Sequence, residues 1–164
     1  MRQELQLELQ SEFSFMKRDM SLKDSKEINI YKKYGCQCGD GWFEFIQELC
    51  QRITNMYKFE GIDIDIEILQ VKEKFGKLRF YYRHFEDSNT IQAIDFLGVG
   101  SLRLSPPSDE ECEYKKKISE LVHSYEEWSS HICEKCGARG ELRTDLLWKK
   151  TLCEDCYQEM IESN

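Results

Sequence analysis

The sequence has little proline and no long apolar run. Its two prolines are adjacent, at Pro106 and Pro107, in a segment that must be a loop because proline donates no backbone hydrogen bond and keeps the residue before it extended. No stretch of about 18 apolar residues occurs, and the first residues lack an apolar signal core. We therefore expect no membrane span, no export signal and a cytoplasmic location, where cysteines stay reduced or bind metal.

Acidic residues outnumber basic ones, and the motifs of common enzymes are absent. The net charge of -8 argues against non-specific binding to duplex nucleic acid, which depends on neutralising phosphates. The sequence has no Ser/His/Asp order, no phosphate-binding glycine loop and no His-Glu metal helix. It therefore indicates no reaction, although an acid–base site built from Asp, Glu and Tyr would leave no signature.

Eight cysteines are present, and four of them form two C-x2-C pairs. Cys133 and Cys136 make the first pair, and Cys153 and Cys156 follow after a sixteen-residue spacer. Gly137 gives the first pair the backbone freedom that lets both sulfurs face inward. Four unpaired cysteines or two disulfides are the alternatives, but a two-residue spacer makes strained disulfides. The spacing predicts one structural Zn²⁺ held by four thiolates, with no open position for a catalytic water.

The residues around these pairs predict a treble-clef-like unit. Short strands are expected at residues 141–143 and 146–148, followed by a helix over residues 153–162. A helix N-terminus favours ionised thiolates, because its N–H groups and dipole attract negative charge. His131 could contact or replace a zinc ligand, although ending the preceding helix is its simpler role.

The middle of the chain predicts an α+β core, a small antiparallel sheet (hairpin or meander) packed by two helices and followed by the zinc unit. The expected elements are a helix over residues 41–57 capped by Asp40, strands over residues 62–68, 77–85 and 90–96 with a hairpin turn near residues 74–77, and a helix over residues 110–130. The apolar stripes expected to face inward are Trp42, Phe45, Ile46, Leu49, Ile53 and Met56 on the first helix, and Ile118, Leu121, Val122, Tyr125 and Trp128 on the second.

These elements divide the chain into an N-terminal extension (residues 1–33), the α+β core (residues 34–131) and the zinc-binding unit (residues 132–164). In the extension, Leu9, Phe13 and Met16 have the spacing of a helix, while alternation before Leu9 would suit a strand. The sequence predicts a helix there.

A second set of cysteines lies in a glycine-rich turn. Cys36 and Cys38 could be two ligands of a second metal, but Cys50 with Cys112 or His84 would have to complete the site. Packing as small apolar side chains in a turn is the simpler interpretation, and Cys50, beside an apolar helix stripe, is expected to be buried.

Basic and aromatic residues gather on the predicted hairpin. Such a surface could bind a phosphorylated base, since cations pair with phosphate and a ring stacks on the base. Pairing of these cations across the hairpin with Asp63, Asp65 and Glu67 explains the same residues without a ligand, and we regard it as the simpler interpretation. The candidate ligand-binding residues are Lys72, Lys74, Lys77, Arg79, Tyr81 and Arg83.

Three motifs together resemble a set of small, largely uncharacterised proteins encoded by phages and prophages. They are the GDGW motif that ends at Trp42, the VKEKFGKLRFY segment from Val71 to Tyr81, and the element from Cys133 to Cys156. The resemblance covers Tyr34 to the end of the sequence. It implies an accessory protein that acts in an infected bacterial cytoplasm, with a role in counter-defence, and it implies no catalytic residue.

The sequence thus predicts a non-catalytic, zinc-stabilised binding protein, with an oligomer possible. Its expected partner is a host protein or a small anionic ligand of nucleotide type, including an immune signal. For a basic host protein, the acidic row of Asp63, Asp65 and Glu67 or the helix around residues 110–127 would provide the surface. The alternatives are a small enzyme acting on a nucleotide or phosphorylated ligand, and a nucleic-acid-binding zinc protein.

Overall fold

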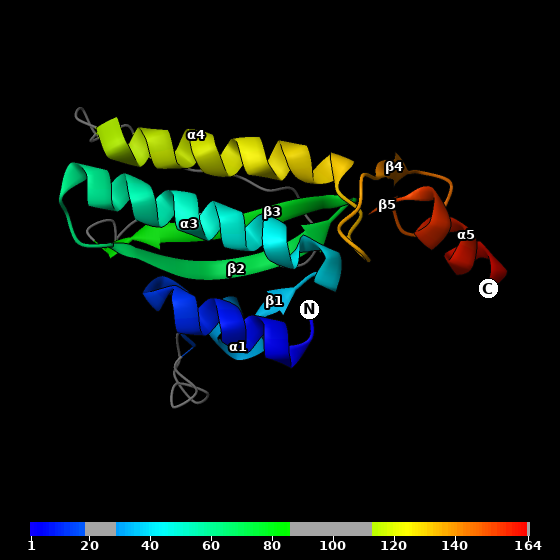
Figure 1. Cartoon of the computed structure of the whole chain (residues 1–164), viewed down its shortest axis with the longest axis horizontal. Helices are drawn as coiled ribbons and strands as arrows, with labels where there is room; N and C mark the ends of the chain where they lie inside the picture. Colours follow the sequence, from blue (N-terminus) through cyan, green and yellow to red (C-terminus); the bar gives the residue numbers. More distant parts are fainter. Residues whose placement is uncertain (19–28, 86–112, 164) are drawn as a thin grey trace.

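The computed structural model describes residues 1–18, 29–85 and 113–163. The long helices α3 and α4 run side by side along the β2–β3 hairpin, and the C-terminal unit projects from one end of it (Figure 1). The α-helices are α1 (Gln3–Glu12), α2 (Ile30–Tyr34), α3 (Phe43–Glu60), α4 (Glu113–Trp128) and α5 (Glu154–Glu162), and the strands are β1 (Cys36–Gln37), β2 (Ile66–Lys74), β3 (Lys77–His84), β4 (Glu141–Arg143) and β5 (Lys150–Leu152). The α+β class is confirmed.

The central sheet has the order β1-β2-β3. Strands β2 and β3 form the expected antiparallel hairpin, and Lys74 pairs with Lys77 around a two-residue turn. Two details of the prediction are wrong. Strand β2 begins at Ile66 rather than at residue 62, because Gly61 ends helix α3 in a left-handed conformation and the chain first has to turn. The sheet is also not purely antiparallel, because β1 pairs with β2 in parallel.

Helix α3 buries most of its predicted apolar stripe, including Ile46, Leu49 and Ile53. A 3-10 turn, Asp40–Trp42, precedes it, so the helix begins later than expected. The predicted Asp40 cap is wrong: the Asp40 carboxylate accepts hydrogen bonds from the backbone and side chain of Arg2, at 2.6 and 2.5 Å.

Helix α4 covers the outer edge of the sheet. Two backbone N–H groups of β3 bond to α4 and the turn after it: Leu78 donates to Ser129 Oγ at 2.8 Å, and Phe80 donates to Glu126 Oε1 at 3.0 Å. This arrangement protects an edge strand that would otherwise offer its N–H groups to another chain. One predicted inward residue is wrong, because Trp128 is exposed at the end of α4, where its ring lies 5.9 Å from that of Tyr125.

The N-terminal region belongs to the same hydrophobic core as the hairpin and α3. Helix α1 forms where a helix was expected, and Leu9, Phe13 and Met16 are buried. The Gln6 side chain accepts a hydrogen bond from Cys36 N at 3.0 Å, and Tyr31 donates to the carbonyl of Met16 at 2.9 Å. Residues 1–18 therefore pack as part of the core.

Several predictions lie outside the described residues: the strand over residues 90–96, the proline loop and Cys112. Within the described ranges, no helix is both long enough and apolar enough to cross a membrane.

Candidate metal centre

The first cysteine pair lies on a tight turn. Cys133 accepts a backbone hydrogen bond from Gly137 N at 2.8 Å and donates one to the carbonyl of Ala138 at 2.7 Å. Gly137 has a φ of 81°, a conformation that favours glycine, as the sequence predicted. The turn thereby directs the Cys133 and Cys136 sulfurs to the same side.

The second cysteine pair lies at the start of α5. Cys153 is the N-cap residue, and its Sγ accepts a hydrogen bond from Cys156 N at 3.5 Å. The helix position was predicted correctly, but the strand before it was not. Strand β5 is Lys150–Leu152, and Leu147 and Trp148 lie in the exposed connection between β4 and β5. The chain pairs later because the buried Thr151 donates its hydroxyl to the carbonyl of Gly76 at 2.6 Å.

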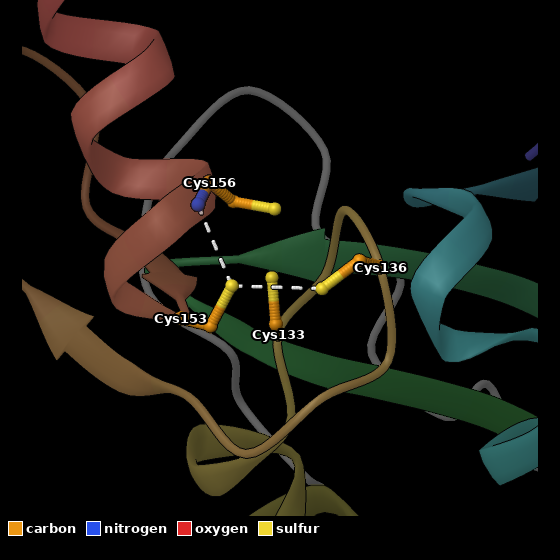
Figure 2. Close-up of side chains that lie close together, drawn as sticks. All are labelled: Cys133, Cys136, Cys153 and Cys156. Atoms are coloured by element: carbon orange, nitrogen blue, oxygen red, sulfur yellow. Dashed lines mark hydrogen bonds between the residues drawn. The ribbon is translucent and has the colours of Figure 1, made fainter.

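The four cysteine side chains point toward one another (Figure 2), and their sulfur atoms all lie within 4.8 Å of one another. The Sγ atoms of Cys136 and Cys153 are 3.6 Å apart. A tetrahedral zinc site with Zn–S bonds of about 2.3 Å places its sulfurs about 3.8 Å apart. The cluster therefore matches the spacing of a four-thiolate site and could hold one metal ion.

The ionisation of these thiols also suits a cation. Burial raises the pKa of Cys133, but hydrogen bonds from the backbone N–H groups of Cys153, Cys136 and Lys135 outweigh it and lower that pKa to about 7. Burial and the neighbouring thiols raise the pKa of Cys156. Adjacent thiolates repel one another, so the cluster resists full ionisation until a positive ion compensates their charge.

The cysteine turn docks on the glycine-rich turn that precedes α3. Gly39 N donates to the Glu134 carboxylate at 2.8 Å, and Gly41 N donates to the Glu134 carbonyl at 2.9 Å. A Cβ atom on Gly41 would lie 2.4 Å from both the Cys133 carbonyl oxygen and the Gly137 nitrogen. The two backbones touch directly, which requires glycine at this position.

Further hydrogen bonds tie the metal centre to the core. The indole Nε1 of the fully buried Trp42 donates to the carbonyl of Ile132 at 2.8 Å. Glu134 N donates to the carbonyl of Thr151 at 2.9 Å, and Lys150 pairs with the buried Glu134 carboxylate at 3.1 Å. The cysteine turn thus packs on the GDGW motif.

Sequence reasoning grouped the four cysteines that the structure brings together, but it missed this docking role of Gly39, Gly41 and Glu134. The sequence feature that could have indicated this role is the pair of glycines beside the large side chain of Trp42, because glycine allows another backbone to approach closely. His131 lies in the 3-10 turn after α4, and its carbonyl accepts from Gly140 N at 2.8 Å.

The other cysteines of the described ranges do not form a metal site. Cys36, Cys38 and Cys50 are buried in the main core, and burial raises the pKa of each thiol, that of Cys36 to about 12. The 133–156 cluster is the one group among the described residues that could hold a metal. The burial of Cys36 and Cys38 fits their packing as small apolar side chains, and Cys112, a possible further ligand, lies outside the described residues.

His84 lies in a separate polar network at the far end of the hairpin. Its Nδ1 is 2.9 Å from Asp65 Oδ1, and Tyr57 and Tyr114 also donate to the Asp65 carboxylate, Tyr114 at 3.2 Å. Although burial raises the pKa of Asp65, these hydrogen bonds lower it overall. His84 is 4% exposed, so its ring is a buried structural group.

The candidate ligand-binding residues of the hairpin are largely engaged within the protein. Lys77 pairs with Glu127 at 2.6 Å, Arg83 pairs with Glu67 at 2.6 Å, and Arg79 Nη1 lies 3.9 Å from Glu126. Tyr81 is buried rather than exposed, and the Lys72 ammonium lies 6.0 Å from the centre of its ring. Lys74 lies over the ring of Phe75 at 5.4 Å. Of the ion pairs expected between these cations and the acidic row, the pair between Arg83 and Glu67 forms.

Comparison with known proteins gives no match: no family model, no curated protein and no solved structure is significantly similar to this chain.

Proposed function

We propose that this protein is a non-catalytic binding protein whose C-terminal unit is held by one structural zinc ion. The convergence of four cysteine sulfurs within 4.8 Å carries the proposal. Zinc suits this donor set because it favours tetrahedral thiolate coordination. With every position filled by cysteine, the ion has no site for a reactive water, so its role is to stabilise the fold.

The small size of the zinc unit supports a structural role for the ion. Its buried cluster contains Cys133, Leu152 and Cys156, with a few partly buried neighbours. Such a cluster is too small to offset the entropy of ordering about thirty residues, for which small units commonly use a metal. The treble-clef-like order of turn, strand pair and helix fits this role.

A protein partner is better supported than a nucleotide-type ligand. A phosphate-binding surface needs cations that remain available, whereas Lys77, Arg79 and Arg83 already lie beside carboxylates. The role in an infected bacterial cytoplasm, including counter-defence against a host immune protein, is carried by the resemblance of the three sequence motifs.

The acidic row expected to bind a basic partner is mostly used internally. Asp65 is enclosed by His84 and two tyrosines, and Glu67 accepts from Lys32 and Arg83. Asp63, the remaining residue of the acidic row, is exposed. Of the two acidic surfaces expected from the sequence, this row is therefore the poorer candidate for binding a basic partner.

Metal analysis tests the zinc proposal. We expect one zinc per chain in the purified protein and none in Cys153→Ser, which removes one of the four sulfurs. Cys50→Ala is the matched control: it removes a thiol buried in the main core and should retain one zinc. Zinc retained by Cys153→Ser with unchanged melting would contradict the assignment.

Calorimetry tests the choice of partner class. Titration of cyclic and linear nucleotides, including NAD-derived ones, should give no heat of binding. If a nucleotide binds and Arg79→Ala weakens that binding about tenfold, the hairpin is a ligand site and the protein-partner proposal is wrong.

A further inference from the structure

The zinc end of the molecule carries large apolar side chains that the fold leaves exposed. Leu147 is 93% exposed, Trp148 75%, Phe75 64% and Leu142 39%. We call these four residues the apolar tip. Single exposed apolar residues are ordinary on a protein surface, but several on one rigid element indicate an interaction site.

The four residues come from two segments that pack together. Leu142 of β4 lies over the hairpin turn, since its Cδ1 would be 2.2 Å from a Cβ atom on Gly76. Its pairing partner Thr151 donates to the carbonyl of Gly76, which follows Phe75 directly. The connection that carries Leu147 and Trp148 begins and ends at this strand pair. The zinc ion would therefore fix the strand pair at which this connection begins and ends.

Phe75 adds a second observation. It has a φ of 54°, the left-handed conformation, and it is the one non-glycine residue with positive φ in the described ranges. Two-residue turns in which both φ values are positive favour Asn, Asp or Gly at this position. An exposed phenylalanine there stabilises neither the turn nor the core, and residues kept in such strained conformations cluster at functional sites.

Cations border the apolar tip. Lys149 follows Trp148, is exposed, and forms no ion pair with any described residue. The Lys74 ammonium lies 5.4 Å from the ring centre of Phe75. Exposed acidic side chains lie on the same strand and connection, at Glu141 and Asp145, so Lys149, next to Trp148, is the cation that the tip itself offers to a partner.

We infer that the apolar tip docks into an apolar pocket, bordered by Asp and Glu side chains, on a protein partner. This inference rests on the proposed binding function and names the surface that performs it. Trp148 and Leu147 are the anchors, because a protruding tryptophan buries a large area in a pocket, and residues of this kind carry most of the binding energy at interfaces. Lys149 would face the carboxylates and raise the association rate.

A displayed library of random peptides, selected on the zinc-loaded full chain, tests the inference. We expect enriched peptides that combine aromatic or aliphatic residues with Asp or Glu. For a synthetic peptide of the enriched sequence, Trp148→Ala should weaken binding about thirtyfold and Leu147→Ala about tenfold. Lys149→Glu should weaken it severalfold and reduce its dependence on salt.

Phe59→Ala is the matched control, because Phe59 is 87% exposed near the end of α3, away from the tip. It should leave peptide binding unchanged. Enriched peptides without acidic residues, peptides insensitive to the Trp148 and Leu147 changes, or no enrichment would each overturn the inference.

Two further measurements separate other occupants. Co-sedimentation with vesicles of neutral or anionic phospholipid, abolished by Trp148→Ala, would overturn the inference in favour of a membrane surface. A dimer in sedimentation analysis that Trp148→Ala dissociates would overturn it in favour of a second copy of the chain. Metal analysis of each tip variant should still find one zinc, so that failure of the docking surface is distinguished from failure of the zinc proposal.

Discussion

The two ends of the β2–β3 hairpin are stabilised by different interactions. At the turn end, the carbonyl of Gly76 accepts from Thr151 of the zinc unit, whose own buried cluster is small. At the open end, Asp65 and His84 are held by two tyrosines from α3 and α4, beside the large core. If the proposed zinc ion is bound, the comparison teaches that a metal can substitute for packing where few apolar side chains are available, while hydrogen bonds suffice where packing is already extensive.

Removing the metal should have the largest effect on the difference in stability between the two ends. A high-affinity chelator should make the backbone amides of residues 132–162 exchange rapidly, while those of Ile66, Ile68 and Tyr82 stay protected. The free energy of unfolding should fall by ~3 kcal/mol or more, because metal binding contributes to folding directly. Hydrogen exchange measured by mass spectrometry checks this, and adding Zn²⁺ back should restore protection. Uniform loss of protection at both ends would show that the ends are not independent.

The next largest effect is expected from Gly41→Ala. The added methyl group would lie 2.4 Å from backbone atoms of the cysteine turn, which cannot move aside without shifting the cysteine side chains. We expect a loss of ~3 kcal/mol in urea unfolding and weaker retention of zinc against a competing chelator. In the control Gly61→Ala, nothing lies within 4 Å of the new Cβ, and only the backbone strain of about 1 kcal/mol applies. Equal losses in the two variants would contradict the docking role of Gly41.

The grouping of the four cysteines could be predicted because their spacing is a local property of the sequence. The contact of the cysteine turn with the GDGW motif could not be predicted, because Gly39 and Glu134 are 95 residues apart and no local pattern links them. The placement of the last strand failed for a related reason. Leu146, Leu147 and Trp148 form an apolar run that favours a strand, but Thr151 forms the long-range hydrogen bond, so the strand lies at residues 150–152.

Long-range contacts also explain the smaller errors in the fold. The Asp40 cap failed because Arg2, far away in the sequence, takes the carboxylate. The parallel strand β1 is two residues long, too short to produce a recognisable period. The hairpin, by contrast, was predictable because its alternation and its turn lie within twenty residues.

At the open end, Asp65→Asn should lower stability by ~1–2 kcal/mol at pH 7. The folded protein lowers the pKa of Asp65, so the carboxylate stabilises the fold above the unfolded pKa of about 3.9, and this contribution is lost as the pH falls through the lower folded pKa. The difference between wild type and variant should therefore shrink below about pH 4. Urea unfolding at several pH values checks it, with the exposed Asp63→Asn as control. A difference that grows as the pH falls would contradict the sign.

The smallest effect is expected at the surface of the turn end. Lys77→Ala removes a partly exposed pair with Glu127 and should change the free energy of unfolding by ~0.5 kcal/mol or less. Thermal unfolding at low and high salt measures it. A loss as large as that of Gly41→Ala would mean that the turn end depends on surface charge rather than on the metal and the backbone contacts.

The contact between Gly39 and Glu134 also constrains the order of events during synthesis. At the usual rate of translation, the 95 residues that separate the partners take roughly 5–20 s to be made. Until then the N–H groups of Gly39 and Gly41 have no Glu134 to bind, and the indole of Trp42 has no Ile132 carbonyl. The nascent chain therefore exposes its GDGW turn to water and to chaperones for seconds, and the turn closes only when the first cysteine pair has left the ribosome.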